Sequence, residues 1–322
     1  MLKFISKKIA LQWIVLLVLL ALSIYIIITQ AQMANEQGTA FLYKYFVQFF
    51  LQYPWLGKGI LIIVLLIQIL FLQYYFAKNE FTAKTSLLPT CFYLSILLLT
   101  KSLITISPFF FTIFFFLIII SINYTLSSEK LKSNAFWAGV LIALGTCFDI
   151  SSLVLIVLAI TTLFINQFSR IKEIGVLLFG FSLVYLYFFA YYFFTNNLPE
   201  WILIFSQLQI LGIMNDHNFD CASTLAPPII LGILYLFFIL KFKMSSELKV
   251  VVQRKRVFTF NMWAILMIIC LFVSNSVYPN ALGYLFVPIA IYLSILAPEK
   301  NPFFINELIT ITTLVTLLIL WL

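Results

Sequence analysis

The sequence predicts an all-α fold, a polytopic bundle of membrane-spanning helices that forms a single domain over residues 1–322. Hydrophobic residues make up 64% of the chain and charged residues only 9%, whereas a soluble domain carries roughly a quarter charged residues. The mean hydropathy of +1.12 is correspondingly high. Apolar runs of about twenty residues, the length that crosses about 30 Å of hydrocarbon, recur from end to end.

About eleven apolar segments are candidates for membrane spans or for short arms of spans. The first follows a basic start, but it is longer than the apolar region of a signal peptide and no small-residue cleavage pattern follows it. We therefore interpret it as a retained first span. The segments are 9–29, 59–77, 85–100, 108–126, 135–148, 150–166, 174–194, 226–240, 257–275, 282–297 and 304–322.

The basic residues predict the orientation of the bundle. Of the 19 Lys and Arg residues, all except Lys44, Lys58 and Lys101 fall between alternate spans. Because positively charged loops stay in the cytoplasm, we expect a cytoplasmic N-terminus and a multi-pass protein of the bacterial inner membrane. This topology also accounts for the net charge of +8, so we expect no nucleic-acid partner.

Two long segments are expected on the outer side, and both contain amphipathic stretches that suit the membrane interface. Segment 30–58 holds "TAFLYKYFVQFFLQYPW", whose aromatic and polar residues favour a helix lying in that interface. Segment 195–225 combines "LPEWILIFSQLQILGI" with the polar "MNDHNFDCAST".

The region 135–166 is too short for two ordinary spans, although basic segments flank it on both sides. Its arms reach roughly 20–25 Å each, so the turn "CFDISS" between them is expected below the outer surface. Span 85–100 is also short, which brings Lys101 to a similar depth. We predict an outward-facing cavity with Asp149 and Lys101 near its floor, because an ionisable group at membrane depth is costly and often functional.

The chain has one histidine, and it lies in the dense polar cluster "NDHNFDC". Asp216 and His217 are capable of metal ligation, but their spacing matches no metal-binding pattern, so neither a metal nor another cofactor is expected. Asn and Asp also favour turns through side-chain hydrogen bonds to the backbone. The cluster is thus either a solvated loop or a substrate-facing segment.

Two acids are candidates for a general base, and three further residues are candidates for substrate contacts. Glu36, in the first outer loop, and Asp149 are the candidate bases. Lys101 would hold a phosphate by charge, with Asp216 and His217 nearby. The plainer alternatives are a surface charge for Glu36 and a structural salt bridge between Asp149 and Lys101. P-loop, dinucleotide-binding, zinc-protease and serine-hydrolase motifs are missing from the sequence.

Four segments carry a resemblance to a family of Bacteroidota polytopic inner-membrane proteins classified as a domain of unknown function. They are "SLLPTCFYLSILLL", "FWAGVLIALGTCFDISSLVLIVLAI", "GFSLVYLYFFAYYFFTNNLPEW" and "YLFVPIAIYLSILAPEKN". The family often has an aromatic–x–Pro at the turn of the short hairpin, where this chain reads Phe148–Asp149–Ile150. The resemblance implies a fold and a location, and no chemistry.

A looser, fold-level resemblance is to the GT-C glycosyltransferases, polytopic enzymes that use polyprenyl-phosphate-linked sugars outside the cytoplasmic membrane. It rests on the acid in the first outer loop (Glu36), the interfacial stretches there, the short hairpin and the late "GYLFVPIAIYL" segment. It implies glycosyl transfer in envelope biogenesis. Against it, the first outer loop has no acidic pair and no arginine is expected on the outer side.

Three functions therefore remain open. The first is glycosyl transfer from a polyprenyl-phosphate-linked sugar, with membrane lipids and that lipid-linked substrate as partners. The second is a non-catalytic scaffold or assembly subunit that binds other envelope proteins. The third is a lipid or solute transporter or flippase, for which paired inverted repeats and several buried charges would be expected and are not evident.

Overall fold

The computed structural model describes residues 9–33, 41–79, 86–100, 102–106, 108, 110–111, 113, 131–165, 171–196, 258, 260–267 and 280–296. Helices dominate this part of the chain, which confirms the all-α class. Three of them are long and apolar enough to cross a membrane, namely α2 (Ile9–Gln30), α4 (Pro54–Asn79) and α9 (Ile171–Phe194). The number of spans and their orientation stay predictions, since segments such as 226–240 and 304–322 lie outside the described residues.

Shorter helices complete the described fold. In chain order they are α3 (Phe41–Gln52), α5 (Leu88–Leu99), α7 (Leu131–Thr146), α8 (Val154–Ile165) and α13 (Phe286–Leu296). The 3₁₀ turns η1 (Ile150–Leu153) and η3 (Asn280–Leu285) precede α8 and α13. The apolar segments 150–166 and 282–297 predict a continuous helix in each case, so these 3₁₀ turns differ from the prediction.

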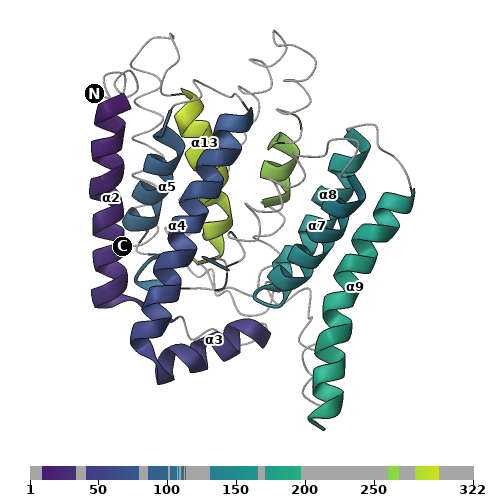
Figure 1. The fold of residues 1–322 in the computed structure, drawn as a ribbon. Coiled ribbons are helices and arrows are strands. Elements are labelled where there is room, and N and C mark those ends of the chain that lie inside the picture. The colour runs from purple at the N-terminus through teal and green to yellow at the C-terminus, as the bar shows by residue number, and fades with distance from the viewer. Residues whose placement is uncertain are drawn as a thin grey trace, which may run out of the picture.

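The pairs of described elements that pack most closely fall into two groups. The core group contains α2, α3, α4, α5, η3 and α13, and the α7–α9 group contains α7, η1, α8 and α9. Figure 1 shows α2, α4, α5 and α13 standing side by side with α3 lying across one end, while α7, α8 and α9 form a neighbouring set. In the same view α9 extends past the turn that joins α7 to α8.

The end of the bundle that carries α3 is closed by a short pair of strands that the sequence did not suggest. Strand β1 (Gln32–Met33) follows α2, and it pairs in parallel with β2 (Thr105–Ile106), which follows α5. Extended backbone here needs hydrogen-bond partners inside the protein. Gln32 N–H donates to the Ile104 carbonyl at 2.7 Å, and the Tyr43 hydroxyl donates to the Ile106 carbonyl at 2.6 Å.

Helix α3 is amphipathic, as segment 30–58 predicts. Tyr43 and Phe50 are buried about two helical turns apart, on one face of the helix, whereas Lys44 and Tyr45 are exposed. Pro54 begins α4, where the missing amide hydrogen costs nothing. The sharp corner between the two helices brings the Phe50 ring against the backbone of α4 at Gly57.

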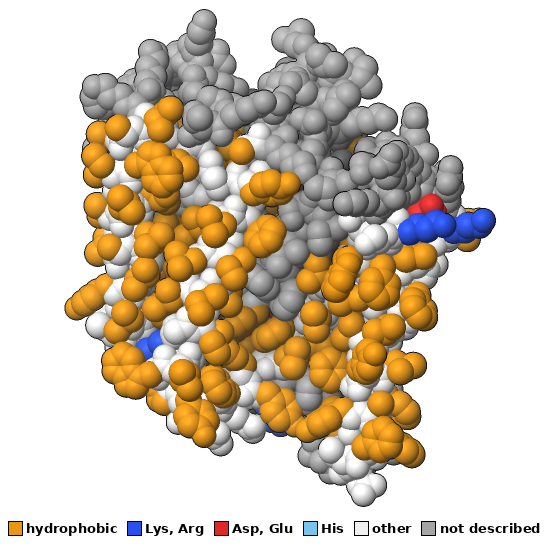
Figure 2. Space-filling view, in the orientation of Figure 1, with side chains coloured by type: hydrophobic (Ala, Val, Ile, Leu, Met, Phe, Trp, Pro, Cys, Tyr) orange, Lys and Arg blue, Asp and Glu red, His pale blue; other side chains and the backbone are white. Residues whose placement is uncertain are grey.

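Most of the visible described surface is apolar (Figure 2). Large hydrophobic side chains are exposed along α2 and α9, for example Ile14 and Leu17 on α2 and Leu186 and Phe194 on α9. Such continuous apolar faces are unfavourable in water and are normal for helices that contact lipid. Together with the helix lengths, they indicate a membrane protein.

Helices α7 and α9 pack with almost no space between their backbones. A Cβ atom added at Gly139 of α7 would overlap the Leu177 carbonyl oxygen and lie 3.0 Å from the Phe181 nitrogen of α9. One added at Gly180 of α9 would overlap the Phe136 carbonyl oxygen of α7. Small residues at helix crossings allow this close approach in membranes, so the two glycines fix the position of the short hairpin against α9.

We predict that Gly139→Ala destabilises the protein by about 1–3 kcal/mol, because the added methyl group forces α7 away from α9. Gly175→Ala is the matched control, since a Cβ atom there meets nothing within 4 Å, and alanine should leave stability unchanged or slightly higher. Thermal unfolding of the detergent-purified proteins, followed by size-exclusion chromatography, measures the difference. Equal melting of both variants and the unmodified protein would contradict the close packing.

Candidate functional site

The candidate site lies at the turn between α7 and η1, residues 147–149, which we call the apex. The apex follows α7 directly, and the backbone N–H groups of Phe148 and Asp149 both donate to the Gly145 carbonyl at 2.9 Å. Ser152 N–H then donates to the Asp149 carbonyl at 3.1 Å and opens the 3₁₀ turn. These bonds use carbonyl groups at the end of α7 that would otherwise lack partners.

Asp149 is the acid that this turn holds inside the protein. Its side chain is only 3% exposed, and the Tyr284 hydroxyl donates a short hydrogen bond to its Oδ2 atom. A buried carboxylate is costly unless it is hydrogen-bonded or paired. The Tyr284 hydroxyl therefore lowers the cost of placing this acid at the apex.

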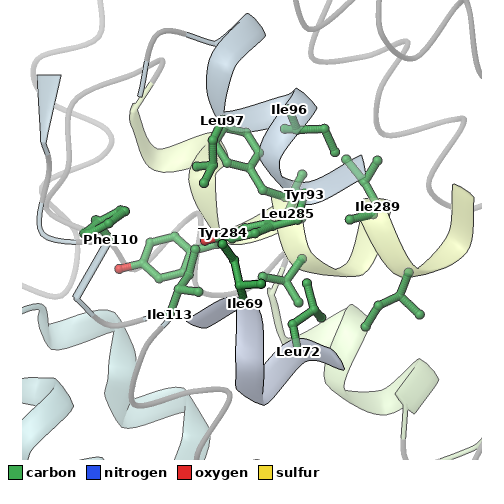
Figure 3. Close-up of a cluster of buried hydrophobic side chains, with 14 of the residues drawn as sticks. Ile69, Leu72, Tyr93, Ile96, Leu97, Phe110, Ile113, Tyr284, Leu285 and Ile289 are labelled. Atoms are coloured by element: carbon green, nitrogen blue, oxygen red, sulfur yellow. The ribbon is translucent and has the colours of Figure 1, made fainter. Parts of the chain in front are cut away.

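Tyr284 reaches Asp149 from the core group, across 135 residues of sequence. It belongs to η3, immediately before α13, and its ring is buried in an apolar cluster with Ile69 of α4 and Ile113 (Figure 3). The apolar surroundings hold the ring, and its hydroxyl group reaches the Asp149 carboxylate. The 3₁₀ turn gives the residue a direction that a regular helix starting at 282 would not.

Aromatic and backbone contacts join the apex to α3. The Phe148 ring stacks on the Phe111 ring with centroids 4.9 Å apart, and Phe111 in turn meets Phe46 of α3 edge-on at 4.8 Å. The Leu42 N–H, at the start of α3, donates to the Cys147 carbonyl at 2.8 Å. The amphipathic helix after the first span is thus docked on the turn that carries Asp149.

The hydroxyl groups of Thr146 and Ser152, on either side of the apex, differ in their hydrogen bonding. Thr146 and Tyr185 share a hydrogen bond of 2.6 Å, which ties the end of α7 to α9. Ser152, which is 1% exposed, has an Oγ atom with no hydrogen-bond partner among the described residues. Buried polar atoms are almost always paired, so an exception calls for an explanation.

Of the five site residues predicted from the sequence, the structure describes one, Asp149. Asp149 lies buried at the apex, whereas Glu36, Lys101, Asp216 and His217 lie outside the described residues, so their roles stay predictions. The proposed pairing of Asp149 with Lys101 is likewise untested. Tyr284 was missed, although its position in "GYLF", at the start of an apolar segment, was the available signal.

The two other lysines expected on the outer side can be placed. Lys44 lies on the exposed face of α3. The Lys58 ammonium group donates to the Ile28 carbonyl at 2.6 Å, near the end of α2, and lies 5.8 Å from the Trp55 ring centroid. A cation at a helix C-terminus is favourable, so Lys58 joins α4 to α2.

No group of three or more His, Cys, Asp or Glu residues that could hold a metal ion occurs within the described part of the chain. Cys91 and Cys147 are free and buried. The apex presents a carboxylate near hydroxyl groups, a combination that suits proton transfer or binding of a polar group.

Comparison with protein-family models, with curated proteins and with solved structures finds no match for this chain.

We predict that Tyr284→Phe lowers the free energy of unfolding by about 1–3 kcal/mol, because the buried Asp149 oxygen loses its donor. Tyr187→Phe removes a hydroxyl group from an exposed position on α9 and should change nothing measurable. Melting temperatures of the two variants in detergent give the comparison. If both variants melt like the unmodified protein, the Tyr284 hydroxyl does not hold the apex.

Proposed function

We propose that this protein transfers a sugar from a polyprenyl-phosphate carrier to an acceptor at the outer side of the bacterial inner membrane. The observation that carries the proposal is the buried Asp149 carboxylate, held by the Tyr284 hydroxyl at a turn on which α3 is docked. An acid retained at this position is more costly than an apolar residue. A chemical task would account for that cost.

In the proposed reaction the acceptor hydroxyl oxygen attacks the anomeric carbon of the lipid-linked sugar. The bond from that carbon to the phosphate oxygen breaks, polyprenyl phosphate leaves, and the acceptor proton passes to a carboxylate. Asp149 or Glu36 is the base that receives the proton. Tyr284 orients the Asp149 carboxylate, Lys101 holds the phosphate, and Asp216 and His217 contact the substrate from the second outer segment.

The fold-level resemblance to GT-C glycosyltransferases supports the proposed sugar transfer, whereas the resemblance to the Bacteroidota membrane family supports only the location in the inner membrane. Three of the features behind the GT-C resemblance meet at the apex, while Glu36 lies outside the described residues. Helix α3 lies in segment 30–58, which is expected on the outer side, the short hairpin supplies Asp149, and the "GYLFVPIAIYL" segment supplies Tyr284. Fold alone does not establish a function, so the argument rests on the residues at this meeting point.

A non-catalytic scaffold of an envelope complex is the second candidate, and one observation favours it. The polar contacts found at the apex, from Tyr284 to Asp149 and from Leu42 to Cys147, are all internal and could serve only to hold the hairpin to the core group. The two functions differ in what happens when the acid is neutralised without changing its shape.

We predict that Asp149→Asn or Glu36→Gln lowers sugar transfer by about 10²–10⁴-fold, the usual effect of losing a general base. The assay uses purified protein in proteoliposomes with polyprenyl-phosphate glucose, galactose or mannose, and it measures the release of polyprenyl phosphate. Size-exclusion profiles and yields should match those of the unmodified protein.

Glu173→Gln is the matched control. Glu173 is also buried, but it lies in the first turn of α9, at the opposite end of the α7–α9 group from the apex. Its replacement should leave the rate unchanged. Wild-type rates in both Asp149→Asn and Glu36→Gln would end the catalytic proposal and favour the scaffold.

A further inference from the structure

The corner between α3 and α4, residues 51–58, exposes large apolar side chains that no described helix covers. Leu51 is 73% exposed, Tyr53 54% and Trp55 77%. In water a cluster of this kind is unfavourable, and it marks a surface that contacts a partner or a membrane. The position of the corner along the spanning helices indicates which of the two it meets.

The corner lies at the level of one membrane surface. Helices α2 and α4 are both long and apolar enough to cross a membrane, and the 22 residues of α2 extend over about 33 Å, close to the thickness of the hydrocarbon layer. The Lys58 ammonium group donates to the Ile28 carbonyl, so the beginning of α4 lies beside the end of α2. Trp and Tyr are enriched at this level, where the ring meets lipid and its polar atom meets water. Trp55 and Tyr53 thus fit the headgroup region of a lipid leaflet.

Lys58 brings a positive charge to the same place. Its ammonium group lies 5.8 Å from the centroid of the Trp55 ring and has three hydrogens, of which the Ile28 carbonyl takes one. In Figure 2 a basic side chain lies among hydrophobic ones at this end of the bundle. The contact with the indole ring holds the cation at the corner. At a lipid surface such a group meets phosphate oxygens, which lysine binds as a point charge.

The charges around the corner favour an anionic lipid over a zwitterionic one. Asp149 and Glu173 are the acidic residues that the structure describes, and both lie in the α7–α9 group. Helix α3 and the first half of α4 carry Lys44 and Lys58 and no carboxylate. The ammonium or choline group of a zwitterionic headgroup would therefore meet no described acid at the corner, and Lys58 already approaches the face of Trp55.

We propose that the corner binds the headgroup of an anionic phospholipid from the surrounding leaflet, of which phosphatidylglycerol is the simplest example. The Lys58 ammonium group contacts the lipid phosphate, while Trp55 and Leu51 pack against the glycerol backbone and the first carbons of the acyl chains. A soluble phosphate would meet the charge but leave the apolar side chains in water. A neutral lipid would cover the apolar side chains but leave the charge without a partner.

This lipid site does not depend on glycosyl transfer, and it has a consequence for the apex. Helix α3 carries the corner at one end, and at its other end the Leu42 N–H donates to the Cys147 carbonyl. A lipid bound at the corner therefore helps to set the depth at which the apex, with Asp149, lies in the membrane.

The first test follows the fluorescence of Trp55 in nanodiscs that hold the full-length protein. The signal of the Trp55→Phe variant is subtracted, which removes the contribution of the other tryptophans among the six in the chain. Phosphatidylglycerol brominated near the glycerol end of its acyl chains should half-quench Trp55 at a mole fraction about three- to tenfold lower than phosphatidylcholine brominated at the same carbons, the effect of one lysine at a lipid surface. Equal quenching by the two lipids would overturn the proposal, because the corner would then contact lipid without recognising the headgroup.

Charge variants test the role of Lys58. Lys58→Met should abolish the preference for phosphatidylglycerol, and Lys58→Arg should keep it, since arginine retains the positive charge. Lys44→Met is the matched control, because Lys44 lies on the exposed face of α3 outside the corner, and it should keep the preference. A preference that persists in Lys58→Met, or that Lys44→Met loses equally, would refute Lys58 as the headgroup ligand. If Lys58→Met fails to fold, the quenching of the unmodified protein still decides the proposal.

Competition identifies the kind of lipid. Unbrominated phosphatidylglycerol should restore Trp55 fluorescence, and polyprenyl phosphate at the same mole fraction should restore it less. Recovery at a lower mole fraction of polyprenyl phosphate would refute a phospholipid occupant and would place the carrier of the proposed sugar donor at the corner instead. Because quenching requires no sugar transfer, failure of the transfer assay and failure of lipid binding are separate results.

Discussion

The hydrogen bond from Tyr284 to Asp149 connects two groups of helices that otherwise pack mainly within themselves. The ring of Tyr284 is fixed by aliphatic neighbours of the core group, and Asp149 is fixed by the turn that ends α7. Neither residue can move far without separating the other from its partner. In an apolar bundle a polar group that loses its partner has no water to replace it. The apex is therefore the point at which the position of one group determines that of the other.

The need of buried polar groups for partners inside the protein also explains the irregular backbone at the end of the bundle that carries α3. Helix α5 ends at Leu99, and the chain continues as a turn and a two-residue strand before residue 108. Several carbonyl groups in and just after this stretch accept hydrogen bonds from distant elements. Tyr43 of α3 donates to Ile106, and Gln68 of α4 donates to the carbonyl of Phe110 at 2.6 Å. Gln68 in turn accepts from the Tyr93 hydroxyl at 2.9 Å. Buried polar side chains in this protein thus support a break in regular structure.

Sequence patterns predicted the parts of this fold that depend on local chemistry. The lengths of the apolar runs predicted α2 and α9 to within a few residues, and the amphipathic pattern predicted α3. The two short arms of the region 135–166 predicted the turn that carries Asp149. The strand pair joins residues 73 positions apart, as in Gln32 with Thr105, and Tyr284 lies 135 positions from Asp149. A composition or periodicity signal contains no information on such pairings. The 3₁₀ turns η1 and η3 were missed for a related reason, because the contact they support, between Tyr284 and Asp149, joins distant parts of the chain.

Stability alone is a weak reason for a carboxylate at the apex. Replacing a buried charged or polar pair with apolar residues is often neutral or stabilising, whereas removing one member is costly. A phenylalanine at 284 with an apolar residue at 149 would fill the same space without a buried acid. The turn also has hydrogen bonds of its own between the backbone groups of Gly145, Phe148, Asp149 and Ser152. A buried acid that packing alone does not require is better explained by a chemical task than by a contribution to stability.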